Sequence, residues 1–264
     1  MAASCYQIGA IRPDEYERCI DLVARAFTTN NPSTVHTEIS FETFRAFALE
    51  DCTRAACVDT GLSLAARDSA TGQVFAVMFL KTFALHQPPE KMFAESSGLA
   101  VSKEMYEALY EDAAVNPFGL CLGSMTSGKT LHGGLGGTAP DAGRSGMGKA
   151  LRVRAVAVAR ERGYNTFVVE PFHPATRHIW TKHCGCSVMA ERPMDTFVSA
   201  SKVRGKHPYK GVGGSGAIVE LVLNRDPRDW PVFWPLNLLR LLWQAEAFGN
   251  LWPAIKGVLG WTPS

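Results

Sequence analysis

Apolar residues recur at intervals of three and four in two stretches of the chain, which predicts two amphipathic helices. The first follows the turn at Pro13 and is stopped by Pro32, because the residue before a proline disfavours helix. The second covers roughly residues 146–162 and ends at Gly163, a residue suited to a helix C-terminus. Its apolar positions form one stripe, made of Met147, Leu151, Ala155 and Val158.

Short apolar or alternating runs bounded by turn residues predict the strands. A hairpin is predicted from strands at 62–67 and 73–80, joined by a turn at 68–72. The other predicted strands lie at 6–11, at two places within 118–138, and at 166–170, 195–201 and 217–223. Further helices are predicted at 41–51, 103–113 and 175–184, the second of them inside an insertion at 85–117.

Strands therefore precede and follow helices, with the longest helix near the middle, which predicts a mixed α/β domain. The 264 residues are enough to bury a large core, and we assign residues 1–225 to this domain. The composition changes at residue 226, because five of the six tryptophans follow it, together with several prolines. We therefore expect residues 226–264 to form an apolar C-terminal extension.

Composition and charge exclude several classes of protein. The chain is 46% hydrophobic and 20% charged, as is typical of a globular domain. A net charge of +2 is too small for a dedicated nucleic-acid binder. The seven cysteines show no regular spacing, which predicts free thiols in a reducing compartment. Neither a signal peptide nor an apolar run of membrane-spanning length is evident, so we expect a cytoplasmic protein.

Residues 123–130 match the phosphate-loop pattern GxxxxGK[ST], in which Lys129 would reach a nucleotide phosphate. This chemistry requires a helix after the loop. Four glycines between 133 and 137 follow instead, and each costs about 1 kcal/mol inside a helix before Pro140 ends it. The pattern therefore favours a turn between two strands.

A second glycine motif, at residues 140–151, lies in a more suitable context. A predicted strand precedes it and the longest helix follows it. Gly146 and Gly148 let the backbone approach a ligand closely, and the start of a helix presents amides with a partial positive charge. Arg144 and Lys149 add charge at the same end, so the motif predicts a pyrophosphate site.

This motif resembles the acetyl-CoA motif of the GCN5-related N-acetyltransferase (GNAT) superfamily, Gln/Arg-x-x-Gly-x-Gly/Ala at the start of a long helix. Gly146 and Gly148 fall at its two glycine positions, whereas Gly143 stands where the family has Gln or Arg. The order of elements over residues 6–223 is similar to that of the family. Residues 61–68 look like the corresponding part of arylalkylamine N-acetyltransferases.

The resemblance implies a mixed, mostly antiparallel sheet with flanking helices. It also implies an enzyme that moves an acetyl group directly from acetyl-CoA, its co-substrate, to a primary amine of a small molecule. Backbone amides near the end of the central strand would stabilise the oxyanion. The residues implied for acetyl-CoA are Thr138, Ala139, Gly143, Arg144, Ser145, Gly146, Met147, Gly148 and Lys149.

Candidates for the base that deprotonates the amine lie near the strand after the longest helix. Glu170 ends that strand and His173 follows it, so either can reach a cleft at the strand's end. Each has a structural alternative, Glu170 as a helix cap and His173 as a turn residue. His132, in the predicted central strand, is a third candidate. Trp180 stands where many family members have a tyrosine that protonates the CoA thiolate, which an indole cannot do.

Three other groups of side chains have less specific patterns. Acidic residues in the early helices either bind a cationic acceptor or lie on the surface; they are Glu38, Glu42 and Asp51. Histidine and cysteine gather later in the chain without the spacing of a metal site, so no metal is expected; they are His173, His178, His183, Cys184 and Cys186. The basic residues of the longest helix are expected on its solvated face; they are Lys149, Arg152, Arg154, Arg160 and Arg162.

The extension contains an apolar segment at 236–248 whose few polar residues gather on one helix face. Contacts through residues 230–261 are expected either with the domain or a second copy of the chain, or with a membrane interface. Two alternatives to the transferase remain open. One is an acyl-CoA-binding protein without catalysis, and the other is a nucleotide-phosphate enzyme that uses Lys129.

Overall fold

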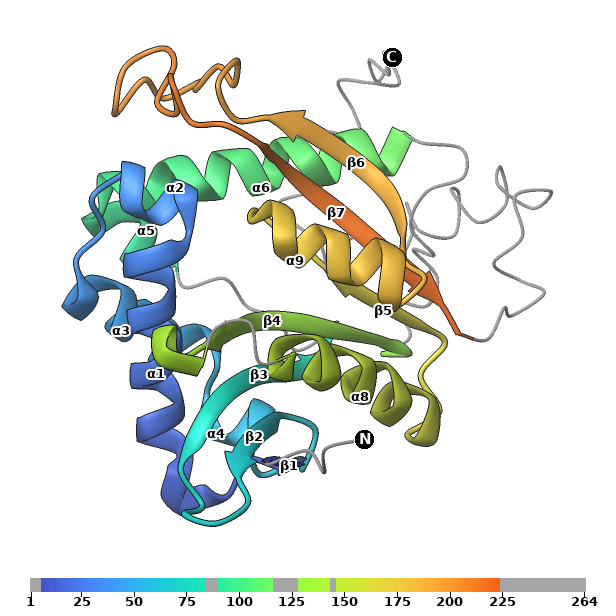
Figure 1. Cartoon of the computed structure of the whole chain (residues 1–264). Helices are drawn as coiled ribbons and strands as arrows, with labels where there is room; N and C mark the ends of the chain where they lie inside the picture. The colour runs from blue at the N-terminus through green and yellow to red at the C-terminus, as the bar shows by residue number, and fades with distance from the viewer. Residues whose placement is uncertain (1–5, 84–89, 116–127, 143–145, 224–264) are drawn as a thin grey trace, which may run out of the picture.

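The computed structural model describes residues 6–83, 90–115, 128–142 and 146–223 (Figure 1). Its centre is a seven-stranded sheet in the order β1-β2-β3-β4-β5-β7-β6. Only β4 and β5 are parallel, and the other neighbours are antiparallel. The strands are β1 (Tyr6–Ala10), β2 (Leu64–Asp68), β3 (Val74–Thr82), β4 (Thr130–Thr138), β5 (Thr166–Val169), β6 (Ser187–Pro193) and β7 (Ser215–Val222).

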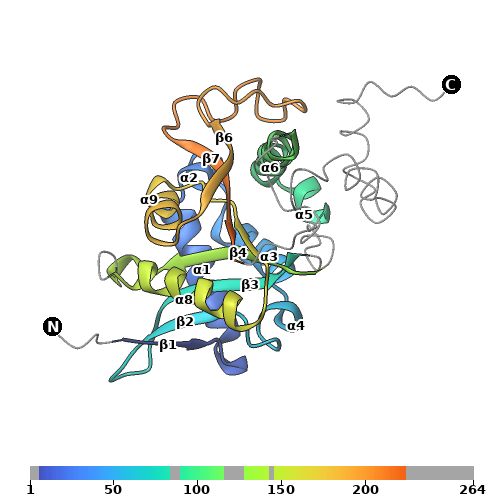
Figure 2. The ribbon, with the colours of Figure 1, turned by 90° about the vertical axis from the view of Figure 1, so that its right-hand side faces the viewer.

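Helices cover both faces of this sheet (Figure 2). The α-helices are α1 (Tyr16–Asn30), α2 (Pro32–His36), α3 (Phe41–Asp51), α4 (Arg54–Cys57), α5 (Glu90–Glu95), α6 (Ser97–Val115), α8 (Met147–Glu161) and α9 (Pro174–His178). Two 3-10 turns, η1 (Pro13–Glu15) and η3 (Pro140–Ala142), precede α1 and α8, and a π-helical turn, η4 (Ile179–His183), continues α9.

Three buried clusters hold the layers together. On one face, α8 and η4 pack on the sheet through residues that include Leu151 and Trp180. On the other face, α1 and α3 cover β2 to β4, and α6 covers β5 to β7 through residues that include Met105 and Leu109. The face covered by α1, α3 and α6 is where the polar side chains described below are buried.

The pairing of β4 with its parallel neighbour ends part-way along β4, because β5 is the shorter strand. The parallel pairing of β4 with β5 begins at Thr130 and ends where Gly133 lies opposite Val169, although β4 continues to Thr138. A bulge interrupts the pairing of β4 with β3 just after Gly133. Gly133 allows the strands to meet closely, because a Cβ there would lie 2.4 Å from Cγ1 of Val169.

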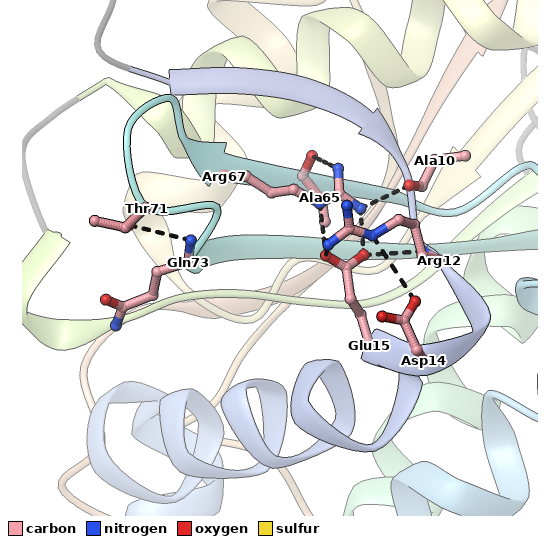
Figure 3. A network of polar contacts seen from close by, with 8 residues as sticks. All are labelled: Ala10, Arg12, Asp14, Glu15, Ala65, Arg67, Thr71 and Gln73. Carbon is pink, nitrogen blue, oxygen red and sulfur yellow. Dashed lines mark hydrogen bonds and ion pairs between the residues drawn. The ribbon is translucent and has the colours of Figure 1, made fainter.

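A buried carboxylate joins the first strands to η1 (Figure 3). Glu15 is 1% exposed and accepts a hydrogen bond of 2.8 Å from Nε of Arg67 and another from Nη2 of the same side chain. Nη2 of Arg12 donates to Glu15 at 2.6 Å, and the backbone amide of Arg12 donates at 3.0 Å. These contacts attach the start of α1 to β2.

The helices confirm most of the sequence predictions. The helix predicted at 41–51 is α3, and α8 buries the predicted stripe of Met147, Leu151, Ala155 and Val158. Gly163 follows α8 with a φ of 73°, as expected at a helix C-terminus. The helix predicted at 103–113 is longer, since α6 covers Ser97–Val115.

One predicted strand is wrong. Residues 195–201 form no regular strand, and the strand in this part of the chain is β6, at Ser187–Pro193. Because β6 is an edge strand that pairs only with β7, most of its side chains are exposed and it lacks an apolar run. Phe197, within the segment predicted as a strand, packs into the apolar cluster under α6 without belonging to a strand. Only one of the two strands predicted within 118–138 lies among the described residues, as β4.

Two further findings concern the cysteines and the length of the helices. The five cysteines in the described ranges are free thiols: Cys19, Cys52, Cys57, Cys184 and Cys186. Among the helices that the structure describes, none combines the length and the apolar character needed to cross a bilayer. The predicted extension at 226–264 lies outside the described residues.

Candidate active site

A buried polar contact joins two of the predicted catalytic candidates. His132 lies on β4 and Glu170 directly follows β5, and both side chains are buried. Nε2 of His132 lies 2.8 Å from Oε2 of Glu170. The parallel pairing places them together, because His132 is opposite Val168 and Glu170 is two residues further along the same face.

Aromatic side chains surround this pair. The hydroxyl of Tyr110, on α6, donates a hydrogen bond to Oε1 of Glu170. Burial and the charge of Glu170 raise the pKa of Tyr110 well above its ordinary value, so it remains a neutral donor. The ring of Phe83 lies 5.6 Å from that of His132 and 6.1 Å from that of Tyr110. Glu170 therefore has one oxygen bonded to a phenol and the other in contact with an imidazole.

A buried ion pair lies on the same face of the sheet. Nζ of Lys81, on β3, donates to Oδ1 of Asp51 at 3.0 Å and to the backbone oxygen of Asp51 at 2.6 Å. Asp51, at the end of α3, is therefore buried rather than on the surface. Glu38 and Glu42 are exposed, which agrees with the second option given for these acidic residues, a position on the surface.

The structure places His173 apart from the Glu170–His132 contact. Its side chain is the N-cap of α9, where Nδ1 accepts a hydrogen bond of 3.1 Å from the amide of Ala175. Burial, and then the positive charge of Arg152, lower the pKa of His173, which favours the neutral ring that a cap requires.

The start of α8 has the form expected of an anion site. Gly146 is its N-cap, with a φ of 80°, and among the described residues no side chain caps the helix there. A Cβ on Gly148 would lie 3.1 Å from Oγ1 of Thr138, so this glycine lets the end of β4 approach the helix. Of the other predicted donor-site residues, Lys149 is exposed and the side chain of Met147 is buried in the core. Residues 143–145 lie outside the described ranges.

Two predictions about the donor side need correction. Arg152 does not extend from a solvated face: Nη1 donates to the backbone oxygen of Gly148 at 2.8 Å, and burial lowers its pKa to about 10. Its buried Nε has no hydrogen-bond partner in the described part of the chain. The amide of Ala139, expected to stabilise an oxyanion, donates to the oxygen of Phe75 at 2.8 Å and is already used.

Trp180 is a core residue. Its ring lies 5.1 Å from that of Phe167 on β5, and the guanidinium of Arg152 lies 6.0 Å from its ring centre. Trp180 therefore fills volume in the core, and its indole cannot act as an acid.

The phosphate-loop pattern does not have the structure that its chemistry needs. Gly128 adopts a φ of 71°, and Thr130 begins a strand rather than a helix. The Thr130 hydroxyl is buried and lies 2.6 Å from that of Thr166, so it does not face a nucleotide. Within the described ranges there is also no group of three or more side chains that could hold a metal ion.

Several solved structures have the same arrangement over most of this chain. The C-terminal condensation domain of Ebony, solved with beta-alanyl-dopamine, has a TM-score of 0.66 and 16% identity over 83% of this chain and 99% of that one. The chain has the GNAT fold. Arylalkylamine N-acetyltransferase 2 from Aedes aegypti has a TM-score of 0.62 and 14% identity over 83% and 99% of the two chains.

Polyamine N-acetyltransferase from Drosophila melanogaster, which forms N-acetylagmatine, has a TM-score of 0.54 and 14% identity, over 83% of this chain and all of that chain. The sequence matches no family model, and no curated protein matches it either. The likeness is therefore one of fold, and it agrees with the mixed, mostly antiparallel sheet expected from the sequence.

Sequence analysis missed one member of the site and ranked another too low. The sequence does not single out Tyr110 as a site residue, because nothing in the helical pattern of α6 distinguishes it from core aromatics. His132 came third among the candidates, yet it is the one that contacts Glu170. The only local signal was a histidine within an otherwise apolar and glycine-rich strand.

Proposed function

We propose that this protein transfers an acetyl group from acetyl-CoA directly to a primary amine of a small molecule. The observation that carries the proposal is the buried contact between His132 and Glu170, 2.8 Å long, at the place where the pairing of β4 with β5 ends. A base with two neighbouring proton-binding groups is suited to accept a proton from an ammonium group.

The donor side of the proposal rests on the start of α8. Acetyl-CoA carries phosphate groups, and the free amides of a helix N-terminus bind phosphate. Arg152 supports an anionic ligand here, because its buried Nε has no hydrogen-bond partner among the described residues and no carboxylate is among the groups that shift its pKa. The sequence predicts that the backbone at 143–148 binds the pyrophosphate, with Arg144 and Lys149 adding charge. We assign the pyrophosphate to the described part of this segment, 146–148, with Lys149 adding charge.

The transfer then needs only groups of this chain and the two substrates. The ammonium of the acceptor gives a proton to the Glu170–His132 pair, and its nitrogen attacks the thioester carbonyl carbon. The C–N bond forms, the C–S bond breaks, and the sulfur leaves with the bonding electrons. The nitrogen gives its second proton to this thiolate, so that the products are the N-acetyl amine and the CoA thiol. We place the oxyanion donors in the bulge of β4 after Gly133, where the ladder to β3 is interrupted and backbone groups are released from pairing.

Thermal unfolding with acetyl-CoA tests the donor site. A ligand at 100 times its Kd stabilises a protein by about 2.7 kcal/mol, which raises the Tm measurably. Gly146→Glu should abolish this rise, because it adds both a negative charge and a side chain at the helix N-terminus. Gly163→Glu is the matched control, since Gly163 also has a positive φ and open space around it, but lies at the other end of α8. Equal loss in both variants would contradict the assignment.

A screen of amines tests the transfer itself. The amines should include arylalkylamines, agmatine and polyamines, the acceptor classes named for proteins of the same fold. Formation of an N-acetyl product, lost in Glu170→Gln, supports the transferase. Stabilisation by acetyl-CoA without any product would instead favour the acyl-CoA-binding protein. A rise in Tm with Mg-ATP alone would contradict both.

A further inference from the structure

The buried Lys81–Asp51 ion pair is not used by the proposed reaction, yet it is among the most enclosed charged groups in the described chain. Lys81 is 2% exposed and Asp51 is 7% exposed. Burying two charges is costly, and such a pair is often no more stabilising than apolar residues of the same volume. Its presence in this core therefore calls for an explanation other than stability.

The position of the pair relative to His132 provides one. Lys81 lies directly opposite His132 in the β3–β4 ladder, so their side chains are neighbours on one face. Asp51 reaches the same place from α3. A Cβ built on Gly134 would lie 3.7 Å from Oδ2 of Asp51 and 3.9 Å from Cε1 of His132. The ion pair and the imidazole thus border the same small volume.

The carboxylates of Asp51 and Glu170 also act on the same neighbour. The pKa of Tyr106, on α6, is raised by burial first, then by the charge of Glu170 and then by that of Asp51. Tyr106 therefore feels both charges. The titratable and charged groups that face this region are Lys81 on β3, Asp51 and Cys52 at the end of α3, Cys57 on α4, His132 on β4, Glu170 after β5, Tyr106 and Tyr110 on α6, and Glu220 on β7.

We propose that Lys81 is a positioning residue that neutralises Asp51, so that Asp51 does not shift the pH at which the Glu170–His132 pair can accept a proton. The inference rests on the proposed function in taking that pair as the base. Without Lys81, the charge of Asp51 would add to that of Glu170. A second negative charge near His132 and Glu170 would hold a proton in the site to higher pH, and the base would be blocked over that range.

The kinetic test compares four variants with the wild type. Lys81→Met should move the acid limb of the kcat/KM profile to higher pH by about one unit, the size expected when one nearby charge loses its counter-charge. Lys81→Met combined with Asp51→Asn removes both charges and should return the limb close to its wild-type position. Lys81→Arg keeps the charge and should do the same. Lys91→Met, which breaks an exposed pair with Glu95, is the control and should leave the profile unchanged.

A second readout requires no turnover. In the ligand-free protein, the midpoint of the His132 imidazole titration, followed by NMR and assigned with His132→Gln, should move to higher pH in Lys81→Met and return in the double variant. If Lys81 is only structural, Lys81→Met lowers the Tm but leaves both the titration and the acid limb in place, and the inference is wrong. If the wild type acetylates no amine, the proposed function fails, and the titration still decides the role of Lys81.

Discussion

Two buried glutamates of this protein have opposite surroundings. Glu15 is held by two guanidinium groups, whose positive charges stay on at any accessible pH (Figure 3). Glu170 is held by a phenol and an imidazole, and neither carries a permanent charge. Burial alone would raise the pKa of Glu15, but the contacts with Arg67 and Arg12 outweigh it and lower that pKa to about 2. The charged partners of Glu15, rather than its burial, therefore decide its pKa, whereas Glu170 is the carboxylate proposed above as part of the base.

The largest expected effect is on catalysis, from Glu170→Gln. The variant keeps the shape of the side chain and removes its basicity, so kcat/KM for the acetyl acceptor should fall by about 100-fold or more. Stopped-time product assays with acetyl-CoA measure the loss, and the acetyl-CoA-induced rise in Tm should remain. A variant with wild-type kcat/KM would show that Glu170 is structural, like Glu15.

Glu15→Gln should have the reverse outcome. Removing one partner of a buried ion pair leaves Arg67 without its counter-charge, at a cost of about 3 kcal/mol in the free energy of unfolding. Denaturant titration measures this cost. At temperatures well below the Tm, kcat/KM should stay at the wild-type value. A large loss of activity in the folded variant would mean that the two carboxylates are not functionally distinct.

The pH dependence of stability sharpens the same contrast. Because the pKa of Glu15 is lowered in the folded protein, its stabilisation is complete above the unfolded value near 4.5 and is lost as the pH falls from there to about 2. The difference between these pKa values corresponds to about 3 kcal/mol. Unfolding free energies measured across this range should decline less steeply in Glu15→Gln than in the wild type. Parallel curves would refute the assignment.

The smallest effect distinguishes the two histidine candidates. His173→Ala removes the N-cap of α9 and should cost about 1 kcal/mol of stability with little change in kcat/KM. His173→Asn should restore the stability, because asparagine also caps helices. His132→Gln should instead lower kcat/KM about tenfold or more, since it removes a proton-binding group from the site. Equal kinetic losses at both positions would place His173 in the reaction as well.

Several elements were predictable because their signals are local. The stripe of α8 and its glycine at 163 lie within one stretch of chain, and a period of 3.6 residues is enough to recognise them. The edge strand β6 was not predictable, because exposed strands pair through the backbone and need no apolar pattern.

The grouping of side chains at the site depended on the tertiary structure. His132 and Glu170 are 38 positions apart in sequence, and Tyr110 and Glu170 are 60 apart. Their contact depends on the register between β4 and β5 and on the place where α6 crosses the sheet. The pairing of Glu15 with Arg67, over 52 positions, depends in the same way on the register of β2. Periodicity within a segment specifies its own conformation, whereas contacts between segments require the order and register of the strands, which no single segment contains.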